Sequence, residues 1–158
     1  MNRQIFQGDV IEQLAKFPDS SIDCIISSPP YFQQRDYQVQ GQIGLESSLE
    51  TYLEKIQQVM DELKRVLNET GTCWINLGDK YGPDKALLCI PHQFLINCKQ
   101  SDWKLRNHVI WYKTNPMPES VKDRLANHWE SVFFFSKNRK YYFDLDAIRV
   151  PSKTDTKP

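Results

Sequence analysis

Short apolar runs and longer amphipathic stretches alternate along the chain, and together they predict strands and helices in turn. Residues 4–7, 22–27 and 72–77 are short runs rich in β-branched and apolar side chains, which is typical of strands. Residues 105–113 and 130–137, rich in Val, Ile, Trp and Phe, are expected to pair antiparallel at a sheet edge. This alternation predicts an α/β fold.

A first helix is expected directly after the first run. Asp9, with Glu12 three residues later, has the pattern of a helix cap, and Pro18 is expected to stop this helix at about Phe17. Residues 32–45 are polar and aromatic and contain two glycines, and we interpret them as a flexible loop able to close over a substrate.

Two further helices follow the loop. Ser47 and Glu50 match a capping box, after which apolar residues recur every three or four positions, as on one face of a long amphipathic helix. We expect Gly71 to end this helix, and residues 85–100 to form another that Pro91 either begins or interrupts. The apolar positions of the long helix are Leu49, Leu53, Ile56, Met60, Leu63 and Leu67.

The sequence Ser28-Pro29-Pro30-Tyr31 directly follows the run 22–27 and predicts a stiff turn at the carboxyl end of a strand, where α/β proteins place ligands. Proline has no N–H group, so the turn offers a serine hydroxyl and a backbone carbonyl as acceptors, with an aromatic ring beside them. Such a turn suits a planar amine. The alternative is a Pro-Pro loop that merely ends a strand.

This tetrapeptide resembles the catalytic motif of DNA methyltransferases that modify exocyclic amino groups, in which the first position is Ser, Asp or Asn and the last is aromatic. Further segments are similar to the family's motifs, in the family's order, from about residue 5 to about residue 150. They are Gly8-Asp9, Asp23, Gly41-Gln42-Ile43-Gly44, Arg65-Val66-Leu67, Asn76-Leu77-Gly78-Asp79, Trp103-Lys104-Leu105-Arg106, Ile110-Trp111-Tyr112-Lys113 and Pro118-Glu119-Ser120-Val121-Lys122-Asp123-Arg124.

The resemblance implies that the catalytic residues are Ser28, Pro29, Pro30 and Tyr31. Ser28 and the Pro29 carbonyl would accept both hydrogens of the target amine, so that the nitrogen lone pair can point at an electrophilic methyl group. Tyr31 would stack on the flipped-out base, an interaction worth roughly 1–3 kcal/mol. The methyl donor would be S-adenosyl-L-methionine and the substrate DNA.

Gly8, Asp9 and Ser27 are the candidates for cofactor binding. Asp9 is similar to the family's acidic residue near the cofactor's adenosine, although a role as a helix cap explains it equally well.

Lys113, Asn115, Ser120 and Arg124 fall in the segment that, in the family, lines the base pocket and meets DNA. Ordinary surface polarity is the competing explanation. Glu130 is open to either role, in the pocket or as a structural ion-pair partner.

The family's glycine-rich turn, which holds the methionine part of the cofactor, has no counterpart among the six glycines of this chain. We therefore expect a partial Rossmann-like sheet: residues 1–150 as the catalytic half of a methyltransferase domain and residues 151–158 as a tail toward a target-recognition region. Residues 4–7 would then lack a neighbouring strand, and residues 24–27 would form an exposed apolar edge. A second polypeptide carrying the recognition region and the cofactor motif is one explanation; a truncated gene is the other.

Ser28 favours cytosine N4 as the methyl acceptor, although adenine N6 is compatible with the same chemistry. A different class of function also stays open. The chain could be a non-catalytic DNA-binding or regulatory remnant in which the motif survives only as a structural turn.

With 158 residues, 40% of them apolar, the chain can form one domain with a hydrophobic core. Four cysteines without Cys-x-x-Cys spacing favour a reducing compartment, and we expect a cytoplasmic protein without membrane spans. Cys89 and His92, three positions apart, could bind a metal, but buried packing is favoured and no metal is expected.

The net charge of zero hides an uneven distribution of charges. Residues 1–103 carry 9 Lys and Arg against 14 Asp and Glu, whereas residues 104–158 carry 11 against 6. The basic part also contains several aromatic residues and could follow DNA phosphates, although a solvated charged face explains it equally well. These aromatic residues include Trp111, Tyr112, Trp129, Tyr141 and Tyr142.

Overall fold

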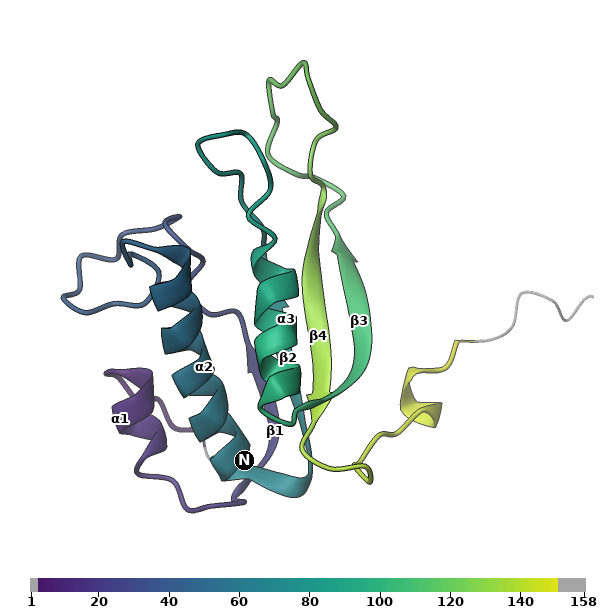
Figure 1. Ribbon diagram of the computed structural model, residues 1–158. Coiled ribbons are helices and arrows are strands. Elements are labelled where there is room, and N and C mark those ends of the chain that lie inside the picture. The colour runs from purple at the N-terminus through teal and green to yellow at the C-terminus, as the bar shows by residue number, and fades with distance from the viewer. Residues whose placement is uncertain (1–2, 151–158) are drawn as a thin grey trace, which may run out of the picture.

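The structure is a computed structural model that describes residues 3–150. It contains a four-stranded sheet with the strand order β1-β2-β4-β3 (Figure 1). β1 (Ile22–Ser27) and β2 (Leu67–Leu77) are parallel, whereas β4 (Trp129–Ser136) runs antiparallel to both β2 and β3 (Lys104–Tyr112). The predicted α/β fold and the antiparallel pair at the sheet edge are confirmed, with β3 as the outer strand.

Two helices, α2 (Leu49–Val66) and α3 (Ile90–Gln100), cover one face of the sheet, and α1 (Val10–Leu14) packs against α2 (Figure 1). A short 3₁₀ helix, η1 (Asp146–Ile148), follows the last strand. No helix within residues 3–150 is long and apolar enough to cross a membrane.

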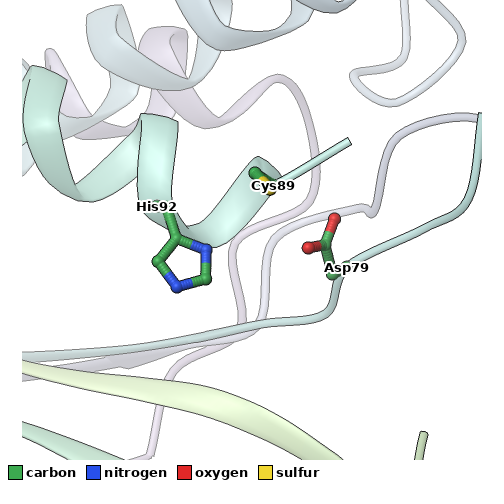
Figure 2. A group of neighbouring side chains, drawn as sticks. All are labelled: Asp79, Cys89 and His92. Atoms are coloured by element: carbon green, nitrogen blue, oxygen red, sulfur yellow. The ribbon is translucent and has the colours of Figure 1, made fainter. Parts of the chain in front are cut away.

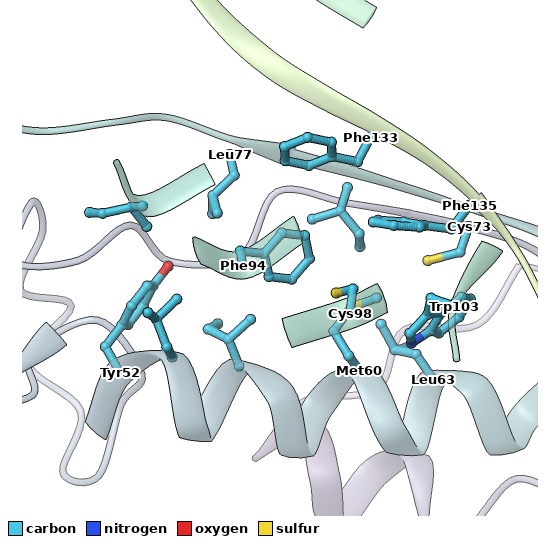
Figure 3. Packing of buried hydrophobic residues seen from close by; sticks show 14 of the residues in the cluster. Tyr52, Met60, Leu63, Cys73, Leu77, Phe94, Cys98, Trp103, Phe133 and Phe135 are labelled. Atoms are coloured by element: carbon cyan, nitrogen blue, oxygen red, sulfur yellow. The ribbon is translucent and has the colours of Figure 1, made fainter. Parts of the chain in front are cut away.

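The hydrophobic core lies between these helices and the sheet (Figure 3). It forms because α2 carries apolar residues at helical spacing, while alternate residues of β2 and β4 face the same side. The intervening residues face the other side, where Phe134 stacks on Trp74 with 4.1 Å between ring centroids. The core residues include Tyr52, Ile56, Met60, Leu63, Cys73, Ile75, Leu77, Phe94, Cys98, Trp103, Phe133 and Phe135.

The amino-terminal segment differs from the prediction. Residues 4–7 form no strand, and Ile5 is 97% exposed, because no described strand lies beside them to complete their hydrogen bonds. The Asp9 cap is confirmed: its Oδ1 accepts hydrogen bonds from the backbone N–H groups of Ile11 and Glu12, at 2.9 and 3.2 Å. The helix it caps ends at Leu14, earlier than predicted.

The predicted ends of the other two helices are also corrected. Ser48, one residue after the expected cap, accepts the bond from the backbone of Thr51. α2 ends at Val66 and passes directly into β2, so Gly71 lies inside a strand, where a Cβ would approach the Asp23 carbonyl oxygen of β1 to 3.0 Å. Of the two roles considered for Pro91, the structure selects the first: it occupies the first turn of α3.

β1 forms one edge of the sheet, as expected for a partial methyltransferase sheet. Ile26 at this edge is 81% exposed. An apolar strand edge of this kind can accept another strand by backbone pairing.

Candidate active site

The turn of residues 28–31, named here the diproline turn, leaves the carboxyl end of β1 beside that of β2. Its backbone is held from two sides. The Tyr52 hydroxyl of α2 donates a hydrogen bond to the Pro30 carbonyl at 2.9 Å. Gly44 packs over the turn with φ of +106°, and a Cβ there would lie 3.0 Å from the Tyr31 carbonyl oxygen, so this close approach requires glycine.

The diproline turn lines a cavity of about 440 Å³, within the range of roughly 300–1,000 Å³ that is typical of small-molecule sites. The same cavity is lined by Asn76 near the end of β2, Lys113 directly after β3 and Glu130 of β4. Arg35 and Tyr37, from the loop after the turn, complete part of its wall. Segments far apart in the sequence therefore meet at one edge of the sheet.

Hydrogen bonds join these side chains into one network around the Tyr31 hydroxyl. This hydroxyl donates to Glu130 Oε2 at 2.8 Å and accepts from Asn76 Nδ2 at 3.0 Å and from Ser28 Oγ at 3.3 Å. Asn76 Nδ2 also donates to Glu130 Oε2 at 2.8 Å, and the Lys113 ammonium pairs with Glu130 Oε1. Each member is thus fixed by at least one other.

The network sets the charge state of its members. Burial and the neighbouring Glu130 carboxylate raise the pKa of Tyr31 to about 12, so its hydroxyl stays protonated at neutral pH. Burial would raise the pKa of Glu130, but hydrogen bonds from Lys113, Asn76 and Tyr31 outweigh it and bring that pKa below the ordinary glutamate value. The site therefore combines a neutral phenol with an ionised carboxylate.

The ring of Tyr31 is packed as closely as its hydroxyl is bonded. A Cβ at Gly78, just after β2, would lie 2.8 Å from Tyr31 Cε2 and 3.2 Å from Cδ2. Because carbon atoms pack best at roughly 3.5–4.0 Å, only glycine leaves room for the ring in this position.

The cofactor candidates lie beside this cavity. Gly8 and Asp9 line a second cavity of about 470 Å³, and Pro30 and Tyr37 line both cavities. Asp9 therefore combines its helix-capping bonds with a place in the cavity wall. Ser27, the last residue of β1, is half-buried and precedes the diproline turn, but does not line either cavity.

The structure divides the four DNA candidates. Lys113 lines the 440 Å³ cavity at the diproline turn and is paired with Glu130. Ser120 and Arg124 instead line a separate cavity of about 530 Å³, where the Arg124 guanidinium stacks 3.8 Å from the centroid of the Tyr81 ring. Asn115 lies between β3 and β4 and lines none of these cavities.

The fold brings Asp79 next to the pair of possible metal ligands, Cys89 and His92 (Figure 2). Cys89 and His92 are both exposed, so the prediction of buried packing is wrong for them. Asp79 Oδ1 accepts the backbone N–H groups of Ile90 and Lys80, at 3.1 and 2.8 Å, and the Cys89 thiol donates to a backbone carbonyl. Cys89 occupies the N-cap position of α3 without a side-chain bond to the helix, and the Asp79 carboxylate accepts the first N–H group of that helix instead.

Some residues of the site were not identified from the sequence. The sequence pattern did not indicate a role for Tyr52, because the apolar face of α2 is enough to explain its burial. Only the tertiary structure brings its hydroxyl to the diproline turn. Arg35 and Tyr37 belong to the loop expected to close over a substrate, but the polar and aromatic composition of that loop did not single them out.

Comparison with known proteins agrees with this geometry. The profile of the DNA methylase family of N6 and N4 methyltransferases matches residues 22–158. The chain belongs to this family. It is 38% identical over 166 residues to the type II methyltransferase M.SfiI of Streptomyces fimbriatus and 37% identical over 173 residues to M.Cfr9I of Citrobacter freundii. These alignments cover 95% and 92% of this chain, but 39% and 58% of the two relatives.

Solved structures show the same fold. The PvuII DNA methyltransferase (cytosine-N4-specific) matches with a TM-score of 0.74 and 21% identity over 88% of this chain and 50% of its own. TTHA0409 of Thermus thermophilus, complexed with S-adenosyl-L-methionine, matches with a TM-score of 0.65 and 23% identity, over 92% and 57%. The chain thus has a partial Rossmann-like methyltransferase fold, and the resemblance found in the sequence is confirmed.

Proposed function

We propose that this chain is the catalytic half of a type II DNA methyltransferase that transfers a methyl group from S-adenosyl-L-methionine to N4 of cytosine in DNA. The observation that carries the proposal is the diproline turn, which opens into the 440 Å³ cavity with Ser28 at its wall. Ser28 is the reason for favouring cytosine over adenine.

The acceptors of the turn suit an exocyclic amine. The Pro30 carbonyl is already paired with Tyr52, whereas no donor among the described residues pairs with the Pro29 carbonyl. Ser28 Oγ and the Pro29 carbonyl can therefore both accept hydrogens of the amine, which draws its lone pair out of the ring. Ser28 acts as an acceptor and forms no covalent bond with the substrate.

DNA would deliver the base by flipping it out of the duplex, and Tyr31 would stack on its face. Lys113, Asn115, Ser120 and Arg124 are proposed to contact the base or the DNA backbone around it. The separation of Arg124 from the active-site cavity favours a phosphate contact for that residue.

The cofactor would bind beside the turn, in the cavity lined by Gly8 and Asp9, with Ser27 close to the reacting groups. It supplies an electrophilic methyl group. The shared wall at Pro30 and Tyr37 supports this placement, because the methyl donor and the amine must meet.

We further propose that a second polypeptide completes the sheet at β1 and brings the glycine-rich cofactor turn and the target-recognition region. The exposed edge of β1 supports this, because the strand's outer backbone groups are available for pairing and the exposed apolar side chain of Ile26 can pack against an added strand. The Ile26→Lys substitution is expected to weaken co-purification of the chain with that polypeptide. A chain that by itself binds the cofactor tightly as a monomer would contradict the requirement for a partner.

Co-expression with the adjoining reading frame, in a host whose DNA lacks modified amino groups, tests the activity. Mass analysis of nucleosides should detect N4-methylcytosine; N6-methyladenine would instead support the adenine alternative. Ser28→Ala should lower the rate by about 100-fold or more, as expected when a polar group that stabilises the transition state is lost. Ser47→Ala, outside the site, is the matched control. Unchanged methylation by Ser28→Ala would identify the turn as structural only.

A further inference from the structure

The hydroxyl of Tyr31 requires an explanation that base stacking does not give. Stacking uses the face of the ring, and a phenylalanine would supply the same face. In this protein the hydroxyl is instead placed at the centre of a network with three hydrogen-bonding partners: Ser28, Asn76 and Glu130. Its position suggests a role in how Ser28 presents itself to the substrate.

The groups at the end of the network fix the direction of every hydrogen bond within it. The amide nitrogen of Asn76 and the ammonium of Lys113 can only donate, and an ionised Glu130 can only accept. The Tyr31 hydrogen must therefore point to Glu130, which leaves the tyrosine oxygen to accept from Asn76 and from Ser28. The hydrogen of Ser28 is thereby directed at the Tyr31 oxygen, and it is not available to a group bound in the cavity.

A serine hydroxyl can donate or accept, whereas an aspartate at the same position of the motif is an acceptor by its charge. A serine that serves as an acceptor must have its own hydrogen held elsewhere. The hydrogen bonds from Ser28 to Tyr31 and from Tyr31 to Glu130 hold the hydrogen of Ser28 in this way. Both lone pairs of the Ser28 oxygen then remain free for a donor in the cavity. Glu130 is suited to the task because its side chain is only 16% exposed and its other oxygen is paired with Lys113.

We propose that Glu130 is a positioning residue that fixes the direction of the hydrogen bonds from Ser28 through Tyr31 to Glu130. Ser28 then presents only acceptors, and the cavity selects an exocyclic amine over an exocyclic carbonyl. The inference rests on the proposed function and adds a basis for the substrate class. It assigns to Glu130 a role that neither the motif nor ion pairing with Lys113 requires.

Two variants interrupt the hydrogen bonds from Ser28 through Tyr31 to Glu130 at different points. Glu130→Gln places an amide where it can donate to the Tyr31 oxygen and so reverse the direction of these hydrogen bonds. Tyr31→Phe keeps the ring but removes the hydroxyl group that joins Ser28 to Glu130. Each is expected to lower kcat by about 10- to 100-fold, as for other partners that orient a functional group, while KM for DNA changes by less than about threefold. Glu69→Gln, at the opposite end of β2 where Glu69 pairs with Lys137, is the matched control.

The decisive measurements are the double variant and a base analogue, both in the co-expressed complex. The kcat of Tyr31→Phe combined with Glu130→Gln should match that of the single variants, because both substitutions interrupt the same series of hydrogen bonds. Duplexes with uracil in place of the target cytosine present a carbonyl instead of the amine. Uracil offers no amine to methylate, and its mismatch with guanine eases flipping in every variant, so the quantity compared is the ratio of the Kd for the uracil duplex to the Kd for the cytosine duplex. Glu130→Gln should lower this ratio relative to the wild type, which a purely structural role of Glu130 would not do.

The results separate this inference from the proposed function. A wild-type complex that transfers no methyl group would overturn the proposed function. If the wild type transfers methyl groups normally, three results would each overturn the inference alone. They are single variants that keep the wild-type kcat, losses of rate that multiply in the double variant, and a ratio of the two Kd values that Glu130→Gln leaves unchanged. Thermal unfolding of each variant shows whether a lost rate reflects lost folding, and Tyr31→Phe provides the test if Glu130→Gln does not fold.

Discussion

Replacing Gly78 by alanine tests how closely the Tyr31 ring is held. The new Cβ would lie 2.8 Å from Tyr31 Cε2, so the ring must move by about 0.7 Å to reach even the short end of the normal contact range. The Ser28 to Tyr31 hydrogen bond is already 3.3 Å long and has little room to stretch. Overpacking of this kind costs about 1–3 kcal/mol of unfolding free energy.

Urea denaturation measures the loss of stability, and methyl transfer by the co-expressed complex measures the displacement of the ring. We expect kcat to fall by about 10- to 100-fold, as for a misplacement of about 1 Å in an active site. Gly82→Ala is the matched control, because its Cβ would meet only the side-chain ends of Asp84 and Leu88 at close range. If Gly78→Ala keeps both the stability and the rate of the wild type, the reasoning about ring placement is refuted.

Three further predictions concern stability. Tyr52→Phe leaves the Pro30 carbonyl without its donor and should cost about 1–3 kcal/mol in urea denaturation; a loss near zero would mean that the turn does not depend on this bond. Asp79→Ala removes the acceptor of the Ile90 N–H group at the start of α3 and should cost about 0.5–2 kcal/mol, whereas EDTA should leave the melting temperature unchanged; a fall of several degrees in EDTA would reveal a metal site. Glu130→Gln should be less stable than the wild type at neutral pH. Because the folded-state pKa of Glu130 is depressed, that difference should shrink as the pH falls below 4.5, and a pH-independent difference would contradict the assigned ionisation.

The sequence by itself determined the four strands of the sheet, the long helix and the diproline turn. These features depend on local chemistry: apolar residues at period two or 3.6, and proline with its fixed backbone and missing N–H. Asn76 lies beside the turn because β1 and β2 are parallel neighbours, and such strands end at the same edge of a sheet. The family motif then supplied the chemistry expected of Ser28.

The tertiary structure decided what depends on contacts distant in sequence. Glu130 meets Tyr31 across 99 positions, and Asp79 accepts the first N–H group of a helix that begins 11 residues later, so no local pattern indicates either pair. Residues 4–7 look like a strand, but they form none because pairing requires a neighbour that the described residues do not supply. Local sequence thus determines which segments form helices and strands. Packing across the sheet determines which side chains become hydrogen-bond partners around the diproline turn.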